Sequence, residues 1–218
     1  MKKLFCCFLL FVFCFNELSA QKKNYFSIEI DADYYHYVVA NAKNRFNYGS
    51  SLLISADIAR IKVSSGINWS KEDSYYTDKP TSSNNFFEKR NYRVRFLNIP
   101  VLVKIRINQL EKIKIGIVSG LIYNKLISSH ITSYYLGQEP LIEKDIQVGS
   151  IGFSWRLGAE VSKLINQCFE VNISPFISYR FIVKNQEVQQ PVYRNINQKE
   201  PFLGFKVGIA YVFYKDEH

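Results

Sequence analysis

The connectors between the extended segments of this chain alternate in length, and this alternation constrains the fold more than any other feature. Counted along the sequence, the seven connectors are about 15, 3, 21, 5, 17, 6 and 20 residues long. In an up-and-down antiparallel barrel every second connector lies at the same end, and bacterial membrane barrels combine an even strand number with short turns at one end and long loops at the other. The eight segments are Tyr25–Tyr34, Ser50–Asp57, Ile61–Ser70, Tyr92–Ile107, Ile113–Ser128, Ile146–Ser162, Phe169–Phe181 and Phe202–Tyr214.

The first 20 residues are typical of an export signal. Two lysines precede an apolar run, Leu4–Phe15, and a short polar stretch ends at Ala20. The run is shorter than the roughly 20 apolar residues of a membrane-spanning helix, so a cleaved signal peptide is the favoured interpretation. We predict cleavage after Ala20 and a mature barrel domain over residues 21–218. The alternative is a lipoprotein cut before Cys14, which the bulk of Phe13 disfavours.

Charge and cysteine content exclude several classes of function. The formal net charge is +9, but the Lys and Arg residues are spread along strands and connectors, without the basic run or helix face that nucleic-acid binding needs. We therefore expect no nucleic-acid partner, and we expect the basic surface to attract anionic lipopolysaccharide. After removal of the signal, Cys168 is the remaining cysteine. With no His or Cys cluster around it, we expect neither a metal nor another cofactor.

The strands alternate between an apolar and a polar face, which indicates a two-faced sheet. In a soluble sandwich or a lipocalin-like barrel the apolar face would point inward, whereas in a membrane barrel it meets lipid. The apolar face here is large and aromatic, the opposite face is rich in Gly and Ser, and aromatics gather near strand ends. These features favour lipid. We predict an all-β fold: an eight-stranded antiparallel up-and-down transmembrane β-barrel with both termini in the periplasm.

Two prolines lie within predicted strands. Pro100 and Pro175 each lack the amide hydrogen that a sheet ladder uses. We therefore expect a bulge or a local break in the ladder at both positions.

The polar face carries charges of both signs, which in a barrel would point into the lumen. An eight-stranded barrel is just wide enough for side chains to fill it, and buried charges must pair. The interpretation we favour is a lumen plugged by ion pairs; a narrow porin or proton path along these pairs is the alternative. The predicted lumen charge network comprises Glu29, Asp31, Asp57, Lys62, Lys104, Arg106, Lys114, Arg156, Glu160, Glu170, Arg180 and Lys206.

Three segments resemble a known family. The strand over 96–106 contains Leu97, Ile99, Pro100 and Lys104 in the spacing L-x-I-P-x-L-x-K. This spacing resembles a strand of the small outer-membrane barrels of Bacteroidetes-type bacteria, the PorT-like or porin-family group. The segments over 114–123 and 204–213 resemble two further strands of that group. The resemblance implies an outer-membrane barrel whose last strand ends in an aromatic signal for the barrel-assembly machinery, here Tyr211 and Phe213.

The resemblance implies a structural or accessory role for such a protein, with secretion-system components among its partners, beside membrane lipid and the assembly machinery. We predict that it is not an enzyme. The alternatives are a barrel that binds ligands or surfaces through loops such as Lys71–Asn91, and a lipid-A-modifying enzyme. For the enzyme, Ser128, His130 and Thr132 would lie on one face of an extended segment, with Ser128 as nucleophile and His130 as base.

Overall fold

The computed structural model describes most of the predicted barrel. Its described residues are 25–37, 43–44, 47–58, 60–76, 87–109, 113–135, 139–144, 151–166, 168–184 and 201–214. The predicted signal peptide and its cleavage site lie outside these residues, as do residues 146–150 of the sixth predicted strand. No helix among the described residues is long and apolar enough to cross a membrane.

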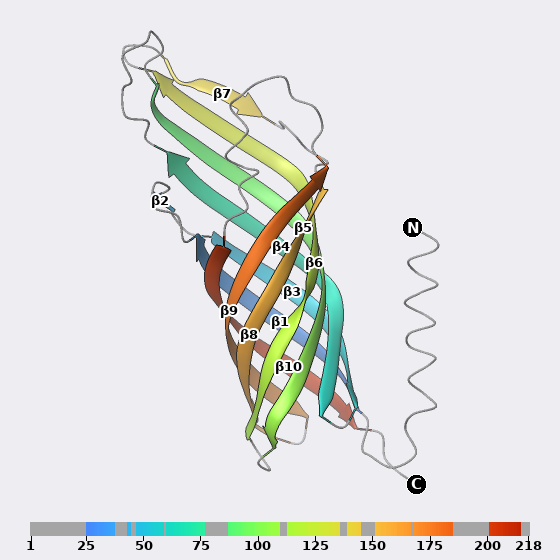
Figure 1. The fold of residues 1–218 in the computed structure, drawn as a ribbon. Helices are drawn as coiled ribbons and strands as arrows, with labels where there is room; N and C mark the ends of the chain where they lie inside the picture. The colour runs from blue at the N-terminus through green and yellow to red at the C-terminus, as the bar shows by residue number, and fades with distance from the viewer. Residues whose placement is uncertain are drawn as a thin grey trace.

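Eight long strands form one closed antiparallel barrel, which confirms the predicted fold class (Figure 1). Around the barrel each strand pairs with the strands that precede and follow it, and the last long strand closes on the first, with Phe26 opposite Phe213. The long strands are β1 (Tyr25–Tyr37), β3 (Asn47–Ile58), β4 (Ile61–Tyr76), β5 (Phe87–Gln109), β6 (Ile113–Tyr135), β8 (Ile151–Leu164), β9 (Phe169–Lys184) and β10 (Pro201–Tyr214); two short strands, β2 (Lys43–Asn44) and β7 (Leu141–Lys144), pair with β4 and β6.

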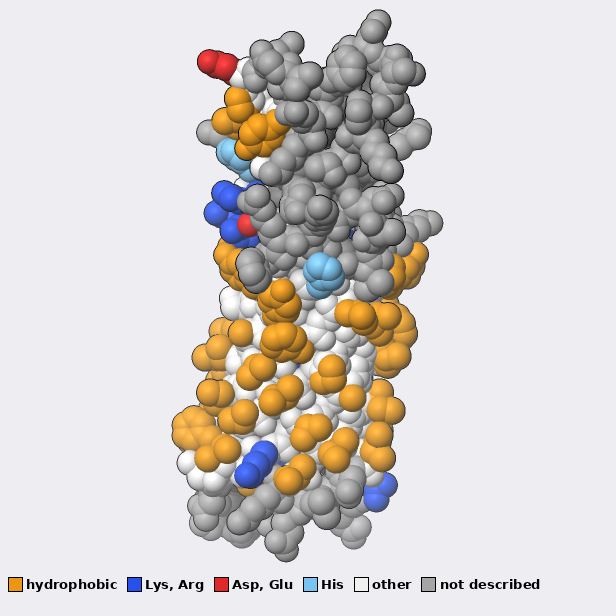
Figure 2. Space-filling model, turned by 90° about the vertical axis from the view of Figure 1, so that its left-hand side faces the viewer, with side chains coloured by type: hydrophobic (Ala, Val, Ile, Leu, Met, Phe, Trp, Pro, Cys, Tyr) orange, Lys and Arg blue, Asp and Glu red, His pale blue; other side chains and the backbone are white. Residues whose placement is uncertain are grey.

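The barrel is apolar outside and polar inside, the reverse of a soluble protein. Outward-facing Ile30, Ile105 and Ile209 are 65%, 55% and 55% exposed, whereas the residues next to them point inward and are buried. Figure 2 shows the hydrophobic side chains spread over the barrel wall. Exposed apolar patches larger than a few hundred Å² are rare on monomeric soluble proteins, so a surface of this kind fits a hydrocarbon environment.

Aromatic side chains mark the two edges of this apolar belt. At the end of the long connectors, called the loop end below, Tyr34 packs on Phe205 and Tyr48 on Trp69, with ring centroids 5.4 Å and 6.2 Å apart. The other end, called the turn end, carries the short connectors and is marked by Tyr211. Bands of this kind are typical of the two interfaces of a bilayer.

Three neighbouring strands extend beyond the barrel at the loop end, and together with the short strand β7 they form what we call the rim sheet. The rim sheet comprises residues 71–76 of β4, 87–95 of β5, 128–135 of β6 and the whole of β7. In Figure 1 these strands rise past the others towards β7. The prediction that 71–91 and 129–145 are connectors was therefore wrong at their ends. The residues there are mostly polar, so hydrophobic alternation gave no signal for a strand.

Each proline interrupts the hydrogen-bond ladder on one of its two sides, as predicted. Between β4 and β5 the pairing runs to Ser65 opposite Val101 and resumes at Asn68 opposite Asn98, which leaves Pro100 unpaired on that side. Pro175 makes a similar break between β8 and β9. On their other sides both residues stay in register. The barrel therefore accommodates each missing amide hydrogen without a shift of register at that point.

Candidate functional site: the filled lumen

The structure places all twelve residues of the predicted charge network inside the barrel. Eleven are buried, and the side chain of Arg156 is 12% exposed. The alternation of the strands explains this, because residues two apart along a strand face the same side. The structure divides the network into layers along the barrel axis, which alternation alone does not reveal.

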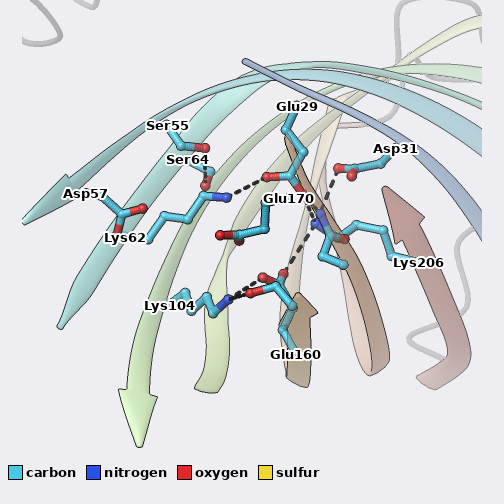
Figure 3. A network of polar contacts seen from close by, with 12 residues as sticks. Glu29, Asp31, Ser55, Asp57, Lys62, Ser64, Lys104, Glu160, Glu170 and Lys206 are labelled. Carbon is cyan, nitrogen blue, oxygen red and sulfur yellow. Dashed lines mark hydrogen bonds and ion pairs between the residues drawn. The ribbon is translucent and has the colours of Figure 1, made fainter. Parts of the chain in front are cut away.

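The central layer is built around Glu29 on β1 (Figure 3). One carboxylate oxygen accepts a hydrogen bond from the Lys62 ammonium and the other from the Lys206 ammonium, each at 2.8 Å. Lys206 also lies 3.3 Å from Asp31 and 3.5 Å from Glu160. Because one ammonium group reaches three carboxylates, the layer behaves as a single network, not as separate pairs.

Glu160 extends this layer across the barrel. It accepts a hydrogen bond of 2.6 Å from the Lys104 ammonium, which also donates to the Ser162 hydroxyl at 3.1 Å. Asn172 donates to Glu29 at 2.8 Å. The central layer therefore receives side chains from β1, β4, β5, β8, β9 and β10, and its hydrogen bonds cross the full width of the lumen.

A second charged layer lies nearer the turn end. Asp57 pairs with Arg106, and Glu170 with Lys114. The Lys114 ammonium also donates to the Tyr25 hydroxyl at 3.1 Å, and both cations lie over the Tyr25 ring. These contacts fill the part of the lumen near the short turns, so side chains close the barrel at the turn end.

The loop end is closed by a third layer, which we call the loop-end plug. The Arg180 guanidinium donates to both carboxylate oxygens of Glu72, at 2.6 Å and 3.1 Å, and it lies 4.5 Å from the centre of the Phe96 ring. Tyr35 donates to Glu72 at 2.9 Å and packs on Phe202. The paired charges and the rings together fill this layer, and Tyr35, Glu72 and Phe202 are buried in it.

Sequence reasoning missed much of the loop-end plug. Glu72 lies in a predicted outer connector, because the strand signal fades after Ser70. Phe176 and Phe202 are apolar but point inward, where alternation alone predicts polar residues; Arg156 lies 3.9 Å from the centre of the Phe176 ring. Asp33 is absent from the predicted network, yet it is buried in the lumen and pairs with Arg156 at 3.8 Å.

Between the loop-end plug and the central layer lies a ring of hydrogen-bonded polar side chains around a small cavity, which Asp33 and Arg156 also line. Asn98 donates to Asn68 at 2.7 Å, and Asn68 donates to Asp33 and Ser51 at 3.0 Å and 2.8 Å. Asn124 continues the ring on β6. The cavity measures about 20 Å³, room for about one water molecule. At this height of the barrel the described side chains therefore leave a small cavity and no wide passage.

The lumen is balanced in formal charge. Among the described residues it holds seven acids, Glu29, Asp31, Asp33, Asp57, Glu72, Glu160 and Glu170, and seven bases, Lys62, Lys104, Arg106, Lys114, Arg156, Arg180 and Lys206. Because the acids and bases are equal in number, each buried charge can be paired with one of opposite sign, as burial requires. They also leave no excess of one sign of the kind that lines an ion-selective pore. The described part of the chain contains no group of three or more His, Cys, Asp or Glu side chains that could hold a metal ion.

The remaining predicted residues lie on the barrel wall. In the family strand motif, Leu97 and Ile99 point outward, whereas Pro100 and Lys104 point inward. Tyr211 and Phe213 point outward at the turn end, with their rings 4.8 Å apart. There they are open to contact with another protein within the membrane.

The three residues of the enzyme hypothesis lie on the outward face of the rim sheet. Ser128 is opposite Arg95, and His130 is opposite Arg93 on one side and Lys144 on the other. The strands that flank His130 in the sheet thus place basic residues beside it. A triad would need a carboxylate there to orient the imidazole.

Comparison with solved structures gives the same fold. No family model matches the chain, and no curated protein matches it. A major outer membrane protein from Thermus thermophilus aligns with a TM-score of 0.53 at 14% identity, covering 88% of this chain and 100% of that one. Neisserial surface protein A aligns over 86% of this chain and 97% of its own, with a TM-score of 0.42 and 12% identity. The chain thus has the fold of small outer-membrane β-barrels.

Proposed function

We propose that this protein is an integral outer-membrane barrel that does not conduct solutes and whose role is structural or accessory. The observation that carries this proposal is the filled, charge-balanced lumen. Three layers of paired side chains cross it, and the cavity between the loop-end plug and the central layer holds about one water molecule. A barrel closed in this way offers its wall and its loop end for function, because the described side chains leave no room for a substrate in the interior.

The role we propose is that of a membrane anchor for the rim sheet, within a secretion or envelope-assembly machine. The rim sheet extends β4, β5 and β6 past the apolar belt, where they would stand outside the membrane. The resemblance of the 96–106 strand to the PorT-like group of Bacteroidetes-type bacteria supports the same role. Export through a signal peptide cleaved after Ala20, and recognition of Tyr211 and Phe213 by the barrel-assembly machinery, are parts of this proposal.

Two measurements on the purified full-length protein test the proposal. Folded barrels migrate faster than boiled ones on a denaturing gel, so we expect a shift between unboiled and boiled samples. In planar bilayers we expect no discrete current steps from the protein that shows this shift. Regular single-channel steps from the folded protein would overturn the closed-lumen proposal and favour a narrow porin. A protein that shows no shift would overturn the membrane barrel itself.

A further inference from the structure

We propose that the outward surface just beyond the apolar belt at the loop end binds the phosphate groups of lipopolysaccharide. The site is a row of three basic residues on neighbouring strands, Lys71 on β4, Arg95 on β5 and Lys125 on β6, which we call the basic row. The inference rests on the proposed outer-membrane location, in which the loop end faces the leaflet that contains lipopolysaccharide.

The sheet register brings the three side chains together on one face. Lys71 and Arg95 are direct cross-strand partners. Arg95 is opposite Ser128 on β6, and Lys125 is opposite Leu97, two residues along β5 from Arg95. Direct partners have Cβ atoms about 5 Å apart and diagonal neighbours about 7–8 Å apart. A phosphate group placed between the long side chains of the row can therefore contact more than one of them.

The height of the basic row on the barrel matches that of lipid headgroups. On each of the three strands, the next outward residue towards the middle of the strand is two positions away from the basic residue. These next residues are Trp69 on β4, Leu97 on β5 and Tyr123 on β6, and they lie at the loop-end edge of the belt. The Lys71 ammonium lies 5.4 Å from the centre of the Tyr48 ring, which belongs to the same aromatic band. An acyl chain lying along the belt would place its phosphate at the basic row.

Two of the three charges of the basic row, those of Arg95 and Lys125, are available to an external anion. Asp73 already pairs with Lys71 at 3.1 Å and with Arg93 at 3.2 Å. Arg95 and Lys125 are exposed, and neither has a salt bridge to another described residue. Because the lumen charges cancel, the excess positive charge of the chain lies elsewhere. Figure 2 shows Lys and Arg side chains gathered directly above the hydrophobic belt.

The chemistry of the row selects a phosphate on a lipid. A guanidinium binds two phosphate oxygens at once, and a neighbouring ammonium adds a second charge-assisted hydrogen bond. A soluble anion would use the same charges but would gain nothing from the apolar surface that begins two residues below. The continuity of the basic row with the belt therefore favours a ligand that has both phosphates and acyl chains.

The test compares binding of lipid A with binding of dephosphorylated lipid A to the full-length protein in detergent, by native mass spectrometry. We expect the wild type to prefer the phosphorylated lipid. We expect the double variant Arg95→Gln/Lys125→Gln to lose affinity for it by on the order of tenfold per side chain, as for the loss of a hydrogen bond between charged groups. The matched control is Arg60→Gln/Lys163→Gln, which removes two exposed cations at the turn end and should leave the preference unchanged.

Equal binding of the two lipids by the wild type would overturn the inference, and this arm needs no variant that must fold. An equal loss in the control variant would overturn it as well, because the binding would then reflect general charge. The gel shift and the bilayer recordings are measured on the same samples. A protein that folds and stays closed but binds both lipids equally would refute the basic row and leave the proposed function standing.

Discussion

At the scale of single residues, the lumen depends on carboxylates that serve several cations at once. Glu29 receives Lys62, Lys206 and Asn172. Alternation along the strand is enough to predict that Glu29 faces inward. Its partners cannot be predicted in this way, because alternation gives the face of a residue but not the register between strands that lie far apart in sequence.

Removing the charge of Glu29 should destabilise the barrel strongly. In Glu29→Gln, Lys62 and Lys206 stay buried while their shared carboxylate is lost, and breaking a buried ion pair in this way costs about 3–5 kcal/mol. The measurement is urea unfolding of the folded protein, followed by the gel shift. Glu139→Gln, which removes an exposed carboxylate, should leave the midpoint in place. A Glu29 variant as stable as the wild type would show that the network does not hold the barrel together.

A second residue-scale prediction concerns the close approach of two strands at Gly66. A Cβ atom on Gly66 would lie 2.0 Å from the carbonyl oxygen of Leu52, a backbone atom that cannot move without the strand. Gly66→Ala should therefore cost about 1–3 kcal/mol through overpacking. The same unfolding assay checks this, with Ser65→Ala on the same strand as the control. Equal stability of both variants would mean that β3 and β4 can separate freely at this point.

At the scale of strands, one inserted residue decides which side chains of β6 point outward in the rim sheet. Up to Leu126 the even-numbered residues of β6 point inward, but a bulge at Ile127 shifts the register, so that Ser129, Ile131 and Ser133 point inward instead. The sequence shows the alternation but not the bulge. This is why the side chains beyond residue 127 could not be assigned to a face before the structure was known.

Deleting Ile127 should therefore reverse the faces of β6 beyond the bulge. With Cys168 replaced by Ser, a thiol reagent should label Thr132→Cys and should spare Ser133→Cys, because only the second position is buried. In the deletion background we expect the opposite pattern. An unchanged labelling pattern would show that a different residue takes up the bulge. The gel shift is the internal control. The barrel below the bulge should still fold in the deletion variant, so the shift should persist.

At the scale of the whole molecule, the sequence predicts an inside-out barrel but not the order of its filling. The inverted polarity of the two faces is present in most of the strands, so the fold class follows from it. The layers depend on which residues meet across the lumen. The loop-end plug is the clearest case, since it joins Tyr35, Glu72, Arg180 and Phe202 from four separate strands.

Because the layers make separate contacts, opening one of them should not open the barrel. In the triple variant Glu72→Ala/Arg180→Ala/Phe202→Ala, the loop-end plug loses its ion pair and one ring of its aromatic cluster, so water should reach the cavity beneath it. With Cys168 replaced by Ser, a membrane-impermeant thiol reagent should then label Ser154→Cys, which is buried in the wild type and lines the cavity. Ser162→Cys, beside Lys104 in the central layer, should stay unlabelled, and bilayers should show no current. Labelling at position 162, or discrete current steps, would mean that the loop-end plug alone keeps the barrel closed.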